Sequence, residues 1–274
     1  MKIEPFCTVD VLPFLQLAAS ENWIAESWEF DFLLSSFPKG CFKARDDNGE
    51  AAGFVTAIRH EQSGWIGNLI VAEKYRGRGI GENLFRGAMR SLWLAGVRTI
   101  WLTASTEGKS LYKKCGFSSI DTIIRWRGSG RQGSIGHDPQ VFNNSLTGIV
   151  ADIDCQAWGD RRDALLAVTA GRGRVISDDG GFAVIQPCGD SRQIGPFLAR
   201  ERGVAEQLLA EAQRTVGSKT ELYLDAPASN RAALRLFNRR RMRIVGSSEL
   251  MYAGAKPDYR PELIYGLATM GSCG

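Results

Sequence analysis

The stretch from Trp65 to Leu84 constrains the possible fold more than any other part of the sequence. It opens with β-branched and aliphatic residues, as in a buried strand, and it closes with apolar residues at helical spacing. Between the two lies the glycine-rich loop Arg76-Gly77-Arg78-Gly79-Ile80-Gly81. Glycines let a backbone approach a ligand closely, and the unpaired amides at the start of a helix favour an anion. The stretch therefore predicts a phosphate-binding turn between a strand and a helix.

Three kinds of phosphate-binding loop can be compared with this hexapeptide. A P-loop is excluded because no Gly-Lys-Ser or Gly-Lys-Thr ends the loop, and glycines spaced G-x-G-x-G do not fit the dinucleotide pattern G-x-G-x-x-G. Arg76, Gly79 and Gly81 do fill the pattern Gln/Arg-x-x-Gly-x-Gly/Ala. In this respect the loop resembles the pyrophosphate loop of the GNAT acyltransferases. An ordinary glycine-rich turn is the alternative.

A second motif follows at the distance that one helix and one strand would fill. Residues 99–104 have the composition of a strand, and residues 105–117 resemble the second GNAT signature, a short helix that ends in L-Y-x-x-x-G-F. Leu111, Tyr112, Gly116 and Phe117 occupy its fixed positions. The two signatures cover about the first half of the chain. The resemblance implies an α/β (α+β) fold, in which a mostly antiparallel mixed sheet is flanked by helices.

The resemblance also implies which residues bind acyl-CoA. The pantetheine arm would pair with the strand backbone, where an N–H near Val71 would bind the thioester oxygen, and the pyrophosphate would lie on the amides of the loop. Tyr112 would be the catalytic acid for the leaving CoA thiolate. Ser105 takes a position that the family often fills with Asn. The expected cofactor-binding residues are Leu69, Ile70, Val71, Arg76, Gly77, Arg78, Gly79, Ile80, Gly81 and Ser105.

The sequence defines the residues that would bind the acceptor substrate less clearly than those that would bind acyl-CoA. Aromatic residues crowd residues 22–37, and this segment lies beside the acceptor pocket in GNAT folds. The resemblance therefore implies substrate contacts for Trp23 and Trp28, and Asn68 could hydrogen-bond the substrate. Packing in the core is the alternative role for the aromatic residues.

The sequence does not identify a general base. An amine acceptor is mostly protonated at neutral pH, because Lys-type groups titrate near pH ~10.4, so a base or an ordered water must first remove a proton. Three carboxylates lie in the presumed pocket segment, namely Glu26, Glu29 and Asp31. Such residues are usually exposed, so none of them is preferred.

The second half of the chain repeats the same order of elements in a degraded form. Residues 200–205 still fit R-x-x-G-x-A but contain one glycine, and Phe237 stands where the first copy has Tyr112. Phenylalanine has no proton to donate. We therefore expect tandem GNAT-like domains at 1–127 and 148–274, joined by a linker at 128–147, with the second domain degenerate and not catalytic.

Composition limits the classes of partner and compartment. The net charge of +4 is spread evenly over both halves, which does not favour a nucleic-acid-binding module. The six cysteines form no CxxC pair, and the two histidines make a metal site improbable. The N-terminal residues contain no apolar run typical of a signal peptide or membrane span. We expect a cytoplasmic protein with reduced thiols, without a metal and with no nucleic-acid or membrane partner.

The function implied by the resemblance is transfer of an acetyl group from acetyl-CoA to a primary amine of a small molecule or peptide. Direct attack in a ternary complex is the expected route. The alternative from another class is a non-catalytic acyl-CoA-binding sensor or regulatory module. A third possibility keeps the enzyme and changes the acceptor to a sugar-linked amine or a hydroxyl group.

Overall fold

The chain folds around one continuous mixed sheet. The computed structural model describes residues 1–132 and 144–274. Within these ranges the order of the strands across the sheet is β1 (Lys2–Pro5), β2 (Phe42–Arg45), β3 (Ala51–Arg59), β4 (Ser63–Val71), β5 (Thr99–Ala104), β11 (Arg243–Gly254), β6 (Ser118–Ser129), β10 (Glu221–Pro227), β9 (Ser191–Ala199), β8 (Gly181–Cys188) and β7 (Arg174–Asp178). The short β12 (Ile264–Gly266) pairs with β9. The described strand pairs are antiparallel except β4–β5 and β9–β10.

The two halves exchange their last long strands. β11 comes from the second half and lies between β5 and β6, while β6 comes from the first half and pairs with β10. The expected fold class, two mostly antiparallel sheets flanked by helices, is confirmed, and the exchange joins the two sheets into one. β6 runs to Ser129, past the predicted boundary at 127. That division into domains stays a prediction, and most of the predicted linker lies outside the described residues.

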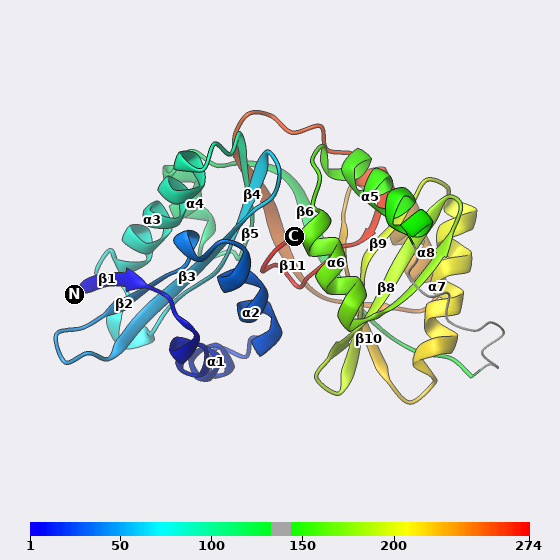
Figure 1. Ribbon diagram of the computed structural model, residues 1–274. Coiled ribbons are helices and arrows are strands. Elements are labelled where there is room, and N and C mark those ends of the chain that lie inside the picture. Colours follow the sequence, from blue (N-terminus) through cyan, green and yellow to red (C-terminus); the bar gives the residue numbers. More distant parts are fainter. Residues whose placement is uncertain (133–143) are drawn as a thin grey trace.

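Eight helices of the described ranges cover the sheet (Figure 1). Their bounds are α1 (Val11–Ser20), α2 (Ser27–Ser36), α3 (Ile80–Leu94), α4 (Lys109–Lys114), α5 (Asn144–Trp158), α6 (Asp163–Arg172), α7 (Arg202–Val216) and α8 (Arg231–Arg239). The sequence predicted helices near six of them, whereas α2 and α5 were not anticipated. α5 begins at Asn144, inside the predicted linker 128–147.

The hydrophobic core has three parts, which follow from the alternation of side chains along the strands. Phe54 and Ile58 of β3 point into a core that α1, α2, α5 and α6 share, so this core runs across both halves. Val55 and Ala57 of the same strand point to the opposite face, where they pack with α3. A separate core on the second half packs α7 and α8. The shared core and the exchanged strands together hold the two halves as one body.

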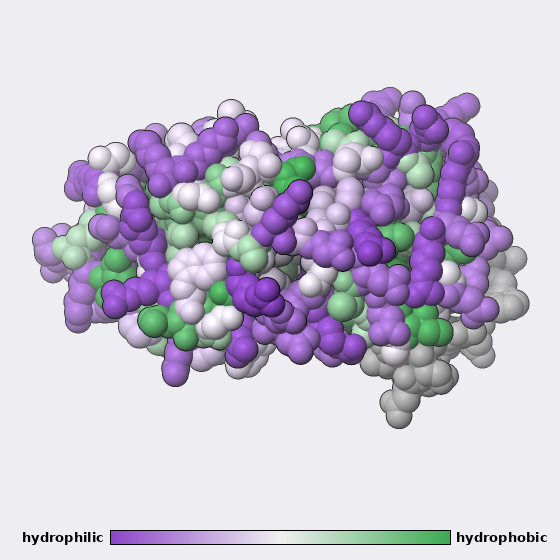
Figure 2. Space-filling model, turned by 90° about the horizontal axis from the view of Figure 1, so that it is seen from above, coloured by the Kyte–Doolittle hydropathy of each residue, from purple (hydrophilic) through white to green (hydrophobic). Residues whose placement is uncertain are grey.

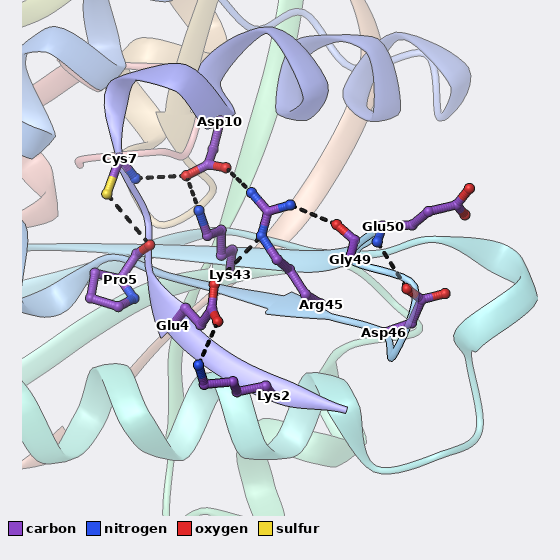
Figure 3. Close-up of polar contacts among 10 residues, drawn as sticks. All are labelled: Lys2, Glu4, Pro5, Cys7, Asp10, Lys43, Arg45, Asp46, Gly49 and Glu50. Carbon is purple, nitrogen blue, oxygen red and sulfur yellow. Dashed lines mark hydrogen bonds and ion pairs between the residues drawn. The ribbon is translucent and has the colours of Figure 1, made fainter.

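A buried polar cluster fixes α1 against the edge of the sheet (Figure 3). Asp10 precedes α1, and its carboxylate accepts hydrogen bonds from Cys7 N at 2.9 Å, Lys43 Nζ at 2.6 Å and Arg45 Nη2 at 3.0 Å. Asp10 is the N-cap residue of α1, but its side chain makes no cap bond to this helix. Its carboxylate binds two cations of β2 instead, since a buried charge needs partners. The cluster thereby positions the segment that leads into α2.

The surface seen from above is mostly hydrophilic, with small and separate apolar areas (Figure 2). No helix in residues 1–132 or 144–274 has the length and apolar character needed to cross a membrane.

Candidate active site

The backbone of the first half opens a gap between two parallel strands. In the described structure β4 and β5 pair only from Ser63 to Trp65, opposite Thr99 to Trp101, and then diverge. A register shift against β3 lies between Phe54 and Thr56, and Asn68 next to it has φ +54°, so β4 carries a bulge at this point. The Asn68 side-chain amide donates to Thr56 Oγ1 at 3.1 Å and supports the bulge. The divergence leaves backbone groups of β4 available to an extended ligand.

The glycine loop follows β4 and leads into α3. Gly77 and Gly79 have φ of +76° and +75°, which side-chain-bearing residues rarely adopt, and a Cβ on either one would meet no neighbouring atom within 4 Å. Gly79 is the N-cap residue of α3. The first amides of this 15-residue helix therefore face outward beside open space. This is the geometry that the sequence predicted for a bound pyrophosphate.

The two arginines of the loop differ in their contacts. Arg76 Nε donates to the carbonyl of Val71 at 3.0 Å, and its guanidinium also pairs with Glu21. The guanidinium of Arg78 lies over the Tyr75 ring, 5.8 Å from its centroid. Arg76 thus ties the loop to the end of β4, and binding of phosphate by either arginine stays a prediction.

A cavity of about 400 Å³ occupies the gap and extends toward the second half. Its lining includes five of the predicted site residues, namely Trp23, Asn68, Leu69, Ser105 and Tyr112. Trp28 is not among the lining residues. It lies under the Arg172 guanidinium, 4.0 Å from the ring centroid, and donates from Nε1 to Glu26 at 2.8 Å. The structure therefore brings Trp23 and Asn68 together at the cavity and places Trp28 at the contact between the halves.

Tyr112 lines this cavity from α4. Its ring packs on Phe85 with the centroids 4.8 Å apart, and Phe117 lies 6.3 Å away. Among the described residues the hydroxyl has no hydrogen-bond partner, so it is available to a ligand. Burial raises the pKa of Tyr112 to about 12, and the phenol therefore stays protonated at neutral pH.

Glu29 is a cavity carboxylate that the sequence did not single out. Of the three candidates in this segment, Asp31 is exposed and Glu26 is held by Arg172 Nη2 at 2.8 Å and Gly189 N at 2.9 Å. Glu29 lines the cavity together with Ser272 and is 9% exposed. Burial raises the pKa of Glu29 to about 7, so both protonation states are accessible near neutrality. No sequence pattern distinguishes it from its two neighbours, because the contact with Ser272 joins distant parts of the chain.

The second half completes the cavity wall. Arg125 of β6 forms a two-bond ion pair with Asp225 of β10, at 2.8 and 2.6 Å, and Arg125 Nη2 also donates to the Met270 carbonyl at 3.1 Å. Both side chains and Met270 line the cavity. These residues were not predicted from the sequence, because two separate domains would place β6 and β10 in different sheets.

The corresponding gap of the second half is filled by the chain itself. β9 and β10 pair at Arg192–Gln193 opposite Leu222–Tyr223 and then diverge, and β12 lies in the space between them. Asn230 donates from Nδ2 to the Ile264 carbonyl at 2.8 Å. An internal strand thus takes the place where an extended ligand would pair. This supports the prediction that the second copy is not catalytic.

Comparison with known families gives a clear result. Two profiles described as acetyltransferase (GNAT) domain match residues 38–119 and 150–266. The chain belongs to the GNAT acetyltransferase family. Both halves of this tandem GNAT protein are therefore recognised, including the second copy, and the protein is an acyltransferase.

Individual proteins of known sequence or structure agree with this assignment. The holothin acyltransferase of a Pseudoalteromonas species is 26% identical over 233 residues, covering 81% of this chain and 78% of that protein. A putative acetyltransferase from Pyrococcus horikoshii is 25% identical with a TM-score of 0.86, covering 100% of this chain and 95% of that one. A GCN5-related N-acetyltransferase from Sphaerobacter thermophilus has the same fold, with a TM-score of 0.65 at 18% identity over 98% of both chains.

Proposed function

We propose that this tandem GNAT protein transfers an acetyl group from acetyl-CoA to a primary amine of a small molecule or peptide. The observation that carries the proposal is the open gap between β4 and β5. It leads from the glycine loop at residues 76–81 to a cavity with Tyr112 and Glu29 in its wall. An acyl-pantetheine arm paired with residues 69–71 would deliver its thioester to this cavity. The second half offers no such gap, because β12 fills it.

Glu29 is the proton acceptor in this proposal. Its carboxylate takes one proton from the ammonium group of the acceptor, which frees the nitrogen lone pair to attack the thioester carbonyl carbon. A pKa of about 7 suits this task, since a base works best when its pKa is near the operating pH. After the reaction Glu29 releases that proton to solvent. The pair of Arg125 and Asp225 is internally neutralised, so Glu29 supplies the uncompensated negative charge of the cavity wall.

Tyr112 acts on the leaving group. When the carbon–sulfur bond breaks, its hydroxyl donates a hydrogen bond to the CoA thiolate. With a pKa of about 12 the phenol is a weaker acid than a thiol of pKa ~8.5, so this hydrogen bond stabilises the thiolate and full proton transfer from Tyr112 is not needed. The second proton lost by the attacking nitrogen ends on the sulfur. The products are an amide, CoA and one proton.

An assay of thiol release from acetyl-CoA tests the proposal. The panel of acceptors is spermidine, free lysine, kanamycin and a lysine-containing tripeptide, and mass spectrometry identifies the acetylated product. We expect at least one amine to accelerate thiol release with formation of an amide. Thiol release that no amine accelerates, in a folded protein that binds CoA, would contradict amine acetylation and favour the sensor alternative.

A further inference from the structure

One segment connects the filled gap of the second half with the open cavity of the first. We call residues 264–273 the strap. It begins with β12 and continues through Met270, Gly271 and Ser272, which line the cavity. The same ten-residue stretch therefore contacts both halves of the molecule.

The first part of the strap is anchored between β9 and β10. Ile264 pairs with Leu198 of β9, and Leu267 N donates to the carbonyl of Asp225 on β10 at 2.8 Å. Asn230, which is 2% exposed, donates to the carbonyls of Ile264 at 2.8 Å and Glu262 at 3.2 Å. Backbone hydrogen bonds to two diverging strands fix both the depth and the register of the strap in this gap.

Two buried glutamines hold the next residues. Gln186 Nε2 donates to the carbonyl of Ala268 at 2.9 Å, and Gln193 Nε2 donates to that of Leu267 at 3.2 Å. A buried amide that loses its acceptor leaves a desolvated donor unpaired, which is unfavourable. Displacing the strap would break both bonds and would leave Gln186 Nε2 with only the carbonyl of Gly195, so the anchored part of the strap is held in place.

The second part of the strap forms a wall of the cavity. The Gly271 carbonyl accepts from Trp65 Nε1 at 3.1 Å, next to the last paired residues of β4 and β5. The Ser272 carbonyl lies against Gly67, where any Cβ would overlap it. The same residue lines the cavity beside Glu29, and its side chain lowers the pKa of that carboxyl. The strap therefore contacts the bulged strand and the candidate base within a few residues of its anchor.

We propose that the strap, locked into the vestigial gap of the second half, sets the position of the acceptor-binding wall, with Asn230 as a positioning residue for acyl transfer. The inference rests on the proposed function. It gives the degenerate copy a role, since its gap holds the segment that shapes the working site. A displacement of about 1 Å of a positioned group can lower a rate by roughly 100-fold, so a small shift of the strap would reach the reaction.

Asn230→Asp tests the inference selectively. Asn230 Oδ1 also accepts from Ala233 N at 3.0 Å as the cap of α8, and an aspartate keeps this bond. The substitution removes the amide donor and points an oxygen at the two carbonyls instead. Asn238→Asp is the matched control, because Asn238 is exposed on the same helix. Gly67→Ala is a second test variant, which displaces the strap at the cavity end without touching its anchor.

Three measurements are made on each full-length variant: kcat and KM with the best amine of the acceptor panel, the Kd of CoA by calorimetry, and hydrogen exchange of residues 264–273. We expect Asn230→Asp and Gly67→Ala to lower kcat/KM for the amine by about 10- to 100-fold and to speed exchange in the strap. The Kd of CoA is expected to stay within about twofold of the wild-type value, and Asn238→Asp to match the wild type throughout.

The outcomes separate this inference from the proposed function. Wild-type kinetics in a variant whose strap exchanges faster would overturn the inference alone. A fall in CoA affinity that parallels the fall in rate would also overturn it, because the defect would then be general. If Asn230→Asp does not fold, Gly67→Ala decides by the same criteria. A wild-type chain without turnover of any amine would overturn the proposed function and the inference together.

Discussion

Glu29 on α2 and Ser272 in the strap line the same cavity, although they lie at opposite ends of the chain. The cavity thus brings a carboxylate of the first half beside a segment anchored in the second half. Burial there raises the pKa of Glu29 to about 7, while Ser272 and Arg172 act in the opposite direction and Glu26 reinforces the rise. Two thiols, Cys188 and Cys273, also lie near this carboxylate, and burial keeps the pKa of both above the usual value.

Glu29→Gln is expected to stabilise the fold at alkaline pH. A glutamate whose pKa rises from 4.5 in the unfolded chain to about 7 in the fold is protonated in both states below pH 4.5, and its cost to the fold grows as the pH rises from 4.5 to 7 and is then constant. The neutral glutamine avoids this cost. We expect the variant to gain at most about 3 kcal/mol in free energy of unfolding at pH 8 and almost nothing at pH 4.5, measured by urea denaturation. An equal gain in the free energy of unfolding at both pH values would show that the effect does not come from ionisation of Glu29.

The same substitution is expected to impair catalysis. Glutamine retains the shape of the side chain but cannot accept a proton, and loss of a general base typically lowers a rate by about 10²- to 10⁴-fold. We expect kcat/KM of the wild type to rise as the pH increases through 7, and we expect this rise to be absent in Glu29→Gln. Profiles of kcat/KM against pH with the best amine acceptor measure both. Asp31→Asn, at the exposed carboxylate of the same helix, is the control and should behave as wild type. An unchanged pH profile in Glu29→Gln would assign the base elsewhere.

Tyr112→Phe is expected to slow the chemical step without weakening CoA binding. The ring contacts with Phe85 and Phe117 remain, and only the donor to the thiolate is lost. We expect kcat to fall by about 10- to 100-fold, since one such transition-state hydrogen bond contributes about 1.4–2.7 kcal/mol. Because the phenol stays protonated far above neutrality, no alkaline limb from Tyr112 should appear below pH 10. Tyr223→Phe on β10 is the control, and a kcat equal to wild type in Tyr112→Phe would reject its role.

Much of the fold could be predicted from the sequence because its signals are local. Strand 99–104 was placed without error, and Gly77 and Gly79 of the predicted glycine-rich loop have positive φ. The duplication also predicted the order of elements in the second half. Hydrophobic alternation and glycine positions act within one element, so a single sequence contains them.

The exchange of β6 and β11 could not be predicted, because either pairing buries the same alternating side chains. Trp126 of β6 packs against Phe237 of the second half. The same sequence pattern would equally have allowed Trp126 to pack inside the first half. The strap could not be predicted for a related reason. Its residues lack strand periodicity, and their partners are buried amides such as those of Asn230 and Gln186 that lie far away in sequence. Glu29 and Arg125 gain their place at the site only through these long-range contacts.

The account depends on one acyl-CoA site, at the glycine loop of the first half, and calorimetric titration with CoA tests it most directly. Gly79→Glu places a carboxylate where the pyrophosphate would lie, whereas Gly203→Glu makes the matched change at the exposed start of α7. Circular dichroism establishes that both variants are folded. We predict binding of one CoA per chain in the wild type and in Gly203→Glu, and no binding in Gly79→Glu. Absence of binding in the wild type, two equivalents per chain, or full binding in Gly79→Glu would contradict the account.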